Sequence, residues 1–187
     1  PVGHAVGTAI TVADLFFKTI LRLGGLTTSD LTISSIGAFE LIAAFQRRAI
    51  DGVSFSLPYS LELAHSGDAV IVADGTDKEP AEYLPIAAGL LLTRPQLCQD
   101  HRSVCEKMVH SMVLAVKFLL TRKDDSIAIL EKRFPKTDKA VVRASYEAVA
   151  RMTNDPPAIT VQALKNGDLM NEQAGFMKKE DALPSYD

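Results

Sequence analysis

Over the first third of the chain, short apolar runs alternate with longer segments in which apolar residues recur at helical spacing. Runs at 5–8, 31–34 and 53–55 have the length and composition of strands. Between them, apolar positions spaced three and four residues apart predict helices at 14–23 and 38–48. Short strands alternating with helices are typical of parallel β-α-β units. The chain therefore opens as an α/β region.

The same pattern continues for one more repeat before it changes. A helix is expected from Pro58 to Ser66, and apolar runs at 69–73 and 86–92 predict two further strands. The polar residues 74–80 between these runs are the best candidate for a hinge or crossover. Beyond this point only helices are predicted, at 103–121, 124–134, 138–152 and 161–174.

Capping residues mark several of these helix ends. Thr11 and Asp14 form a variant of the capping box at the start of the first helix, and Gly24 and Gly25 end it. The residues expected to cap the later helices are Asp124, Asp138 and Thr160.

A turn rich in small hydroxyl residues follows each of the first three strands. These turns are 8–11, 34–37 and 54–58. The carboxyl ends of parallel strands lie together in an open sheet, and ligands bind in that crevice. The turns therefore predict one binding cleft. Its candidate ligand-binding residues are Thr8, Thr11, Val12, Ser35, Gly37, Ala38, Ser56 and Tyr59.

Several of these residues also have a purely structural interpretation. Thr11 and the amides of Val12 and Ala13 could bind an anionic or carbonyl group, or Thr11 could only cap its own helix. Gly37 could line the cleft, or a glycine could be present there only because the turn needs its backbone conformation. Tyr59 could stack on a ligand ring, donate its hydroxyl or pack inside the fold. The sequence leaves these alternatives open.

Bulk composition excludes several classes of protein. The 187 residues are 47% hydrophobic and 23% charged, as in ordinary soluble domains. A net charge of -3 without a basic stripe speaks against a nucleic-acid partner. No apolar run is long enough to cross a membrane. The chain opens at Pro1 without a start Met, so we expect it to be an excerpt or a processed product.

Reactive side chains are few and scattered. On one straight helix Cys98 and Cys105 would be too far apart for a disulfide, so we expect two unbridged thiols. A helix break near Asp100 and His101 would instead let them meet. No His lies beside a Ser or Cys with a third partner, and no phosphate-loop or metal-ligand spacing occurs. We therefore predict a protein that is not an enzyme, with no cofactor and no metal.

The order of motifs resembles one family along essentially the whole chain. The α/β region carries G-L-x-x-x-D-L-T-I, then L-I-A-A-F-x-x-x-x-I-D-G, a strand and P-Y. The helical region carries D-D-S-I-A-I-L-E-K-R-F, P-P-A-I-T and Q-A-G-F-M-K-K. This order resembles the substrate-binding proteins of ABC importers for nitrate, sulfonate and taurine. Relatives that handle the thiamine pyrimidine precursor belong to the same superfamily.

The resemblance implies a periplasmic-binding-protein type II fold and a transport function. Residues 1–80 correspond to the second α/β lobe of a two-lobed clamp with a doubly wound sheet. Residues 81–187 correspond to the crossover strand and the helices that return to the first lobe, most of which this chain lacks. The partners implied are a small-molecule ligand and the membrane permease of an ABC importer. A periplasmic or membrane-anchored extracytoplasmic monomer is expected.

Two departures from the family pattern bear on the ligand. Only Thr11 carries a hydroxyl at 9–12, where relatives often have a Gly-Ser-Thr type of turn, and Leu57 stands where they often have Glu. The cleft should thus be more apolar, which favours an organic sulfonate, carboxylate or heteroaromatic ligand over nitrate. Two alternative functions remain. One is a thiamine-pathway synthase of the same superfamily, and the other is the ligand-sensing domain of a regulator.

Overall fold

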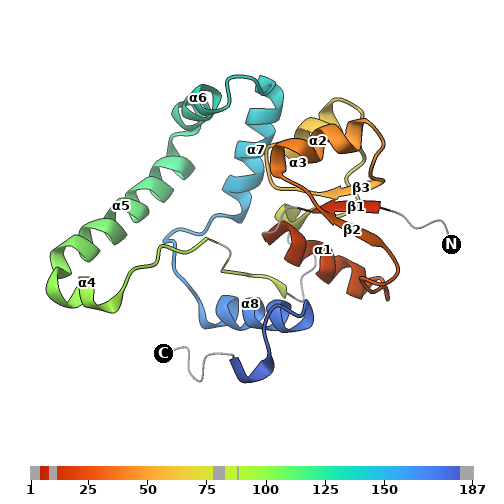
Figure 1. Ribbon diagram of the computed structural model, residues 1–187. Coiled ribbons are helices and arrows are strands. Elements are labelled where there is room, and N and C mark those ends of the chain that lie inside the picture. Colours follow the sequence, from red (N-terminus) through yellow and green to blue (C-terminus); the bar gives the residue numbers. More distant parts are fainter. Residues whose placement is uncertain (1–4, 9–11, 78–82, 88, 182–187) are drawn as a thin grey trace.

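A small parallel sheet organises the amino-terminal part of the computed structural model, which describes residues 5–8, 12–77, 83–87 and 89–181 (Figure 1). Its strands are β1 (Ala5–Thr8), β2 (Thr32–Ser35) and β3 (Gly52–Ser54), in the order β2-β1-β3. Helix α1 (Val12–Leu23) lies on one face, and α2 (Ala38–Gln46) and α3 (Tyr59–His65) lie on the other (Figure 1). The predicted doubly wound α/β architecture is confirmed.

The strand order places a crevice at the end of the central strand. The chain moves from β1 outward to β2 and then returns across β1 to β3. Helices on either side of such a reversal leave the sheet in opposite directions, which opens a crevice at the carboxyl ends of the strands. The strands point with these ends toward the carboxyl-terminal helices (Figure 1).

Tight packing of α2 on the sheet forms the core of the α/β part. Leu41, Ala44 and Ile50 are buried there. A Cβ atom on Gly7 would collide with the side-chain ends of Leu41 and Ile50, so β1 needs a glycine at this position. At the far ends of α2 and α3, the Gln46 amide and the Ser66 hydroxyl both bind Asp68 and lower the pKa of its carboxyl group.

Helices make up the rest of the fold. They are α4 (Pro95–Asp100), α5 (Arg102–Thr121), α6 (Lys123–Arg133), α7 (Lys139–Met152) and α8 (Val161–Gln173), with short 3-10 turns η1 (Gly75–Asp77) and η3 (Lys179–Asp181). Helix α7 packs on α3 and η1, and α8 packs on α1. By contrast, α5 is an arm without a buried residue (Figure 1). None of the described helices is both long enough and apolar enough to cross a bilayer.

A second core joins α8 to the α/β part. Leu15 of α1, Tyr83 and Met170 of α8 are buried against one another. Tyr83 is wholly buried, and its hydroxyl donates a hydrogen bond of 2.7 Å to Gln173 of α8. The described chain after η1 is therefore anchored beside α1 before it continues into the helical arm.

Helix ends follow the predicted caps in most cases. Gly25 has a φ of 72° directly after α1, and the amide of Leu26 donates to the carbonyl of Leu21, as a glycine stop requires. Asp138 and Thr160 cap α7 and α8 as predicted. Asp124 is not a cap, because α6 begins one residue earlier and no side chain caps it. The predicted capping box includes Thr11, which lies outside the described residues.

The two strands predicted at 69–73 and 86–92 are absent from the described residues. Val70 and Val72 are 86% and 93% exposed, and Leu92 is 78% exposed. An apolar run becomes a strand only where a neighbouring strand pairs its amide and carbonyl groups. No described strand adjoins either run. The sequence prediction was therefore wrong for the described chain.

The expectation of two unbridged thiols was also wrong. Cys98 of α4 and Cys105 of α5 form a disulfide, with their Cα atoms 5.6 Å apart. His101 separates the two helices and has the non-helical angles φ -134° and ψ 54°. This break turns α4 back toward α5, whereas one straight helix would hold the Cα atoms about 10 Å apart. The alternative that the sequence left open is the one that the structure adopts.

Candidate functional site

The carboxyl edge of the sheet brings together the three strand ends from which the predicted turns begin. Thr8 ends β1 and pairs in register with Ser35 of β2 on one side and with Ser54 of β3 on the other. Hydroxyl residues thus form one row across the strand ends. The parallel order predicted from the sequence accounts for this row, because it places all three carboxyl ends at the same edge.

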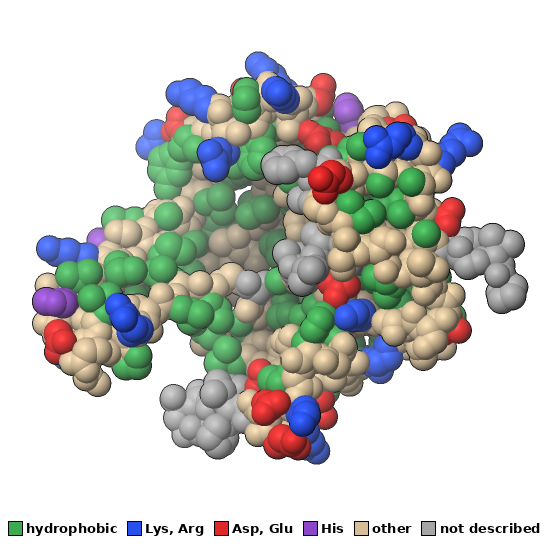
Figure 2. Space-filling model, viewed as in Figure 1, with side chains coloured by type: hydrophobic (Ala, Val, Ile, Leu, Met, Phe, Trp, Pro, Cys, Tyr) green, Lys and Arg blue, Asp and Glu red, His purple; other side chains and the backbone are tan. Residues whose placement is uncertain are grey.

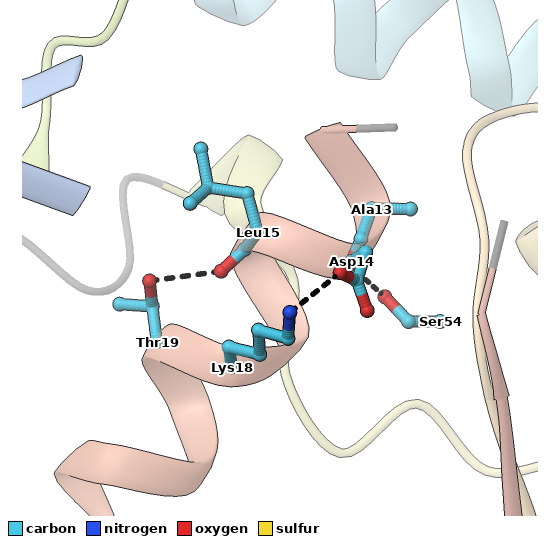
Figure 3. A network of polar contacts seen from close by, with 6 residues as sticks. All are labelled: Ala13, Asp14, Leu15, Lys18, Thr19 and Ser54. Atoms are coloured by element: carbon cyan, nitrogen blue, oxygen red, sulfur yellow. Dashed lines mark hydrogen bonds and ion pairs between the residues drawn. The ribbon is translucent and has the colours of Figure 1, made fainter. Parts of the chain in front are cut away.

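Helix α1 is fixed to β3 at this edge. The Ser54 hydroxyl donates a hydrogen bond of 2.7 Å to the carbonyl of Ala13 in the first turn of α1 (Figure 3). In the same turn the carboxylate of Asp14, which is buried, forms an ion pair of 3.0 Å with Lys18. The hydroxyl of Ser54 thus ties the first turn of α1 to β3.

The candidate residues occupy the strand ends and helix starts as follows. Thr8 and Ser35 end their strands, Gly37 precedes α2, and the first residues of the helices are Val12, Ala38 and Tyr59. Val12, Ser35, Gly37 and Ser56 are exposed, and Tyr59 is half-buried. Thr11 lies outside the described residues. The structure thus places the exposed candidates around one edge, and their contact with a ligand stays a prediction.

The start of α2 carries its own carboxylate. Gly37 caps the helix without a side-chain hydrogen bond, and Glu40 lies in the first turn. The carboxylate of Glu40 folds back toward Gly37 so closely that a Cβ atom there would collide with it. Because the exposed Glu40 side chain can move aside, this contact does not by itself require a glycine at position 37. The sequence analysis missed Glu40, although its spacing of three residues from Gly37 is that of the acid in a capping box.

Aromatic stacking fixes the third turn. The rings of Phe55 and Tyr59 lie 4.8 Å apart with an angle of 17° between their planes. Pro58 between them is buried, whereas Ser56 remains exposed. One face of the Tyr59 ring is thus occupied by a neighbour within the chain. The other ring face and the hydroxyl group of Tyr59 take no part in this stack, so its contact with a ligand stays a prediction.

Acidic side chains lie in the first turn of all three helices around the edge. They are Asp14 in α1, Glu40 in α2 and Glu62 in α3. A carboxylate near a helix amino end stabilises the helix dipole and offsets its attraction for a second anion. The local charge at the edge is therefore less favourable to a small hard anion than bare helix starts would be.

A cavity of about 210 Å³ lies beside the start of α1. Val12 and Leu15 form one wall, Ile86 another, and Asn171 and Phe176 a third. The ammonium group of Lys18 lies 3.9 Å from the centre of the Phe176 ring and covers it. The cavity combines apolar walls with an amide group, as small-molecule sites do. Val12 belongs both to this cavity and to the candidate residues at the edge of the sheet.

Reactive groups do not gather at this edge. Among the residues that the structure describes, no three His, Cys, Asp or Glu side chains lie close enough together to hold a metal ion. His65 at the end of α3 lies 3.8 Å from the carboxylate of Asp138, the cap of α7. What the described edge offers is hydroxyl groups, helix starts and apolar walls.

Comparison with known proteins rests on structure alone. No protein-family model and no curated protein sequence matches the chain. One similar structure is the alkanesulfonate-binding protein SsuA from Xanthomonas axonopodis pv. citri bound to MOPS. The TM-score is 0.76 at 20% identity, and the match covers 96% of this chain and 61% of that one.

A second similar structure is the periplasmic aliphatic sulphonate binding protein SsuA from Escherichia coli. Here the TM-score is 0.73 at 18% identity, and the match covers 98% of this chain and 56% of the other. The chain thus spans about three-fifths of the length of these proteins. Nearly all of it follows their chain path, and it has the fold of the corresponding part of a sulfonate-binding protein.

Proposed function

We propose that this chain is the second lobe and the returning helical part of a solute-binding protein that serves an ABC importer. The observation that carries the proposal is the edge of the β2-β1-β3 sheet, where hydroxyl residues and three helix starts surround a crevice. The match of nearly the whole chain to two sulfonate-binding proteins supports the same function. Residues 1–80 form the lobe, and residues 81–187 return to the first lobe.

Capture of the ligand in this proposal is a shift in a hinge equilibrium. The first lobe closes over the edge of the sheet, and a ligand that contacts both lobes favours the closed state by its difference in affinity. The hydrogen bond between β3 and α1 and the stacking of Tyr59 on Phe55 hold the ligand-binding edge of this lobe in one shape. A preformed binding surface lowers the loss of conformational entropy on ligand binding.

The proposed ligand is a small organic molecule with one polar group: a sulfonate, a carboxylate or a heteroaromatic ring. Leu57, which is half-buried, adds an apolar side chain next to the exposed hydroxyl residue Ser56. The carboxylates of the first helical turns weaken the attraction for a small hard anion. Both features favour a ligand that is held by hydrogen bonds and apolar contact more than by charge.

The proposed location is outside the cytoplasm, beside the permease that accepts the ligand. Disulfides such as that between Cys98 and Cys105 are typical of oxidising compartments. The name of the similar Escherichia coli protein describes it as periplasmic. In this proposal the protein acts as a monomer and delivers one ligand at a time.

Thermal-shift screening of the complete protein tests the proposal. Sulfonates, aromatic acids and pyrimidines are added at millimolar concentration, and a true ligand at 100 times its dissociation constant stabilises the fold by about 2.7 kcal/mol. The Ser35→Ala and Ser56→Ala double variant should reduce this stabilisation. The matched Ser29→Ala and Ser66→Ala variant lies away from the edge and should keep it. Absence of stabilisation by every compound would contradict the proposal.

A further inference from the structure

Both cysteines of the chain lie at the corner between α4 and α5, residues 98–105. This corner is the outer end of the helical arm, which projects away from the α/β part (Figure 2). Neither α4 nor α5 has a buried residue, and Cys98 and Cys105 are themselves half-buried. No buried core therefore holds the corner in place, and a small molecule in solution can reach its sulfur atoms.

The local sequence gives no reason for a helix to break at this corner. Between Gln96 and Lys107 there is neither Gly nor Pro, the residues that most often end a helix. The break falls at His101, and no side chain caps the start of α5. The first amides of α5, those of Arg102 and Ser103, thus lack helical acceptors. A continuous helix would give each of them a carbonyl partner four residues earlier.

The disulfide and a continuous helix exclude each other. The two cysteines are seven residues apart in sequence, and their Cα atoms are separated by 5.6 Å. In a continuous helix they would lie two turns apart on one face, with their Cα atoms about 10 Å from each other. A disulfide needs a Cα separation below about 7 Å. The bond therefore requires the break at His101, and its loss removes this constraint.

We propose that the corner is a redox-dependent conformational switch. While the disulfide is intact, α4 folds back toward α5, and once the disulfide is reduced, residues 95–121 form one straight helix. The reductant is a dithiol, one thiolate of which attacks a cysteine sulfur and forms a mixed disulfide, while the other cysteine leaves as a thiolate. The second thiol of the reductant then displaces the first cysteine. Two electrons and two protons pass to the protein, and the reductant becomes a cyclic disulfide.

The switch changes the length and direction of the arm. The six residues of α4 would extend α5 by about 9 Å, and the exposed residues Leu90, Leu91 and Leu92, which precede α4, would move with them. In the proposed location outside the cytoplasm, the bend forms only after the chain leaves the reducing compartment in which it is made. This consequence rests on the proposed function, whereas the switch itself does not.

A distance across the corner of the complete protein tests the switch. Gadolinium labels are attached at Gln96 and Lys117, which are both exposed, through an unnatural amino acid that leaves the cysteines unmodified. Electron–electron resonance then gives the label separation before and after treatment with dithiothreitol. Reduction should lengthen it to about 32 Å, the length of a straight helix between these positions. An unchanged distance after full reduction, verified by thiol titration, would overturn the switch.

Two variants separate the disulfide from the break itself. Cys98→Ser with Cys105→Ser should show the long distance without any reductant. Arg102→Pro is the matched control, because Pro suits the first position of α5 but blocks a continuous helix. Its disulfide should form as before, and its label distance should not reach the straight-helix value on reduction. A short distance in the double Ser variant would show that the break does not depend on the disulfide.

Hydrogen exchange provides a second measurement at the corner. Reduction should slow the exchange of the Arg102 and Ser103 amides at least about tenfold, because both gain a helical carbonyl partner. In Arg102→Pro the Ser103 amide should exchange equally fast in both redox states. Faster exchange along α4 on reduction would mean that α4 unfolds instead of joining α5, which would contradict the proposal.

Discussion

Gly7 shows how one residue sets the distance between two layers of the fold. It lies in β1, the central strand, directly below Leu41 and Ile50, which are both buried. Gly52 in the neighbouring strand differs, because a Cβ atom there would meet Val6 at an ordinary contact distance of 3.4 Å. Two strand glycines thus have different roles, which depend on what lies above them.

Replacement of Gly7 by Ala should destabilise the fold by about 1–3 kcal/mol, because the buried core above it has no room for a methyl group. Gly52→Ala is the matched control and should change the free energy of unfolding by less than about 0.5 kcal/mol. Urea denaturation followed by circular dichroism measures both. Equal stability of the two variants would show that α2 moves away from the sheet at little cost.

The helices α6 and α7 differ in how their amino ends are capped. Asp138 accepts a hydrogen bond of 2.7 Å from the amide of Ala140 and also lies near His65 of α3. Asp124 stands in the first turn of α6, whose start no side chain caps, whereas Asp125 next to it pairs with Arg122. Both helices open with an Asp in the sequence, but only in α7 does the carboxylate reach a backbone amide at the helix start.

Asp138→Ala should lower the free energy of unfolding by about 1 kcal/mol, the usual cost of losing an N-cap. Asp124→Ala should lower it by less than about 0.5 kcal/mol, because only an exposed charge near the helix dipole is lost. Thermal or urea unfolding of the two variants gives the comparison. A larger loss for Asp124→Ala would contradict the assignment of the caps.

The molecule as a whole exposes many large apolar side chains. The runs around Val70, Val72 and Leu92 have no strand partner among the described residues, and α5 exposes Val109 and Leu114. Val70, Ile71 and Val72 are consecutive and all exposed, and exposed apolar patches are typical of interaction sites. In the proposed two-lobed protein, the first lobe covers these residues. The similar sulfonate-binding proteins are longer than this chain, which agrees with that proposal.

The chain of 187 residues should therefore self-associate when it is produced alone. Val70→Lys with Val72→Lys should raise the dissociation constant of this association about tenfold or more, since burial of a Val side chain contributes about 1.5 kcal/mol or more. Ile159→Lys with Val161→Lys adds the same charge around the start of α8 and should have little effect. Sedimentation velocity measures all three proteins. A monomer at every concentration would contradict the prediction.

Local patterns in the sequence determined those parts of the fold that depend on neighbours along the chain. The order of strands and helices up to α3, the glycine stop after Leu23 and the caps at Asp138 and Thr160 all depend on residues within one turn or one strand. The parallel connections followed from that order, whereas the doubly wound arrangement of the strands was implied only by the resemblance to a family. The convergence of the three described strand ends at one edge followed from the parallel order.

Tertiary structure alone decided the features that depend on distant contacts. The apolar runs 69–73 and 86–92 looked like strands, but a strand needs a partner that local sequence does not specify. The disulfide depended on the helix break at His101, and the use of the Ser54 hydroxyl depended on where α1 lies. An apolar pocket is lined by residues between 57 and 149, which only the packing of α7 against α3 and α6, and of α6 against α5, brings together.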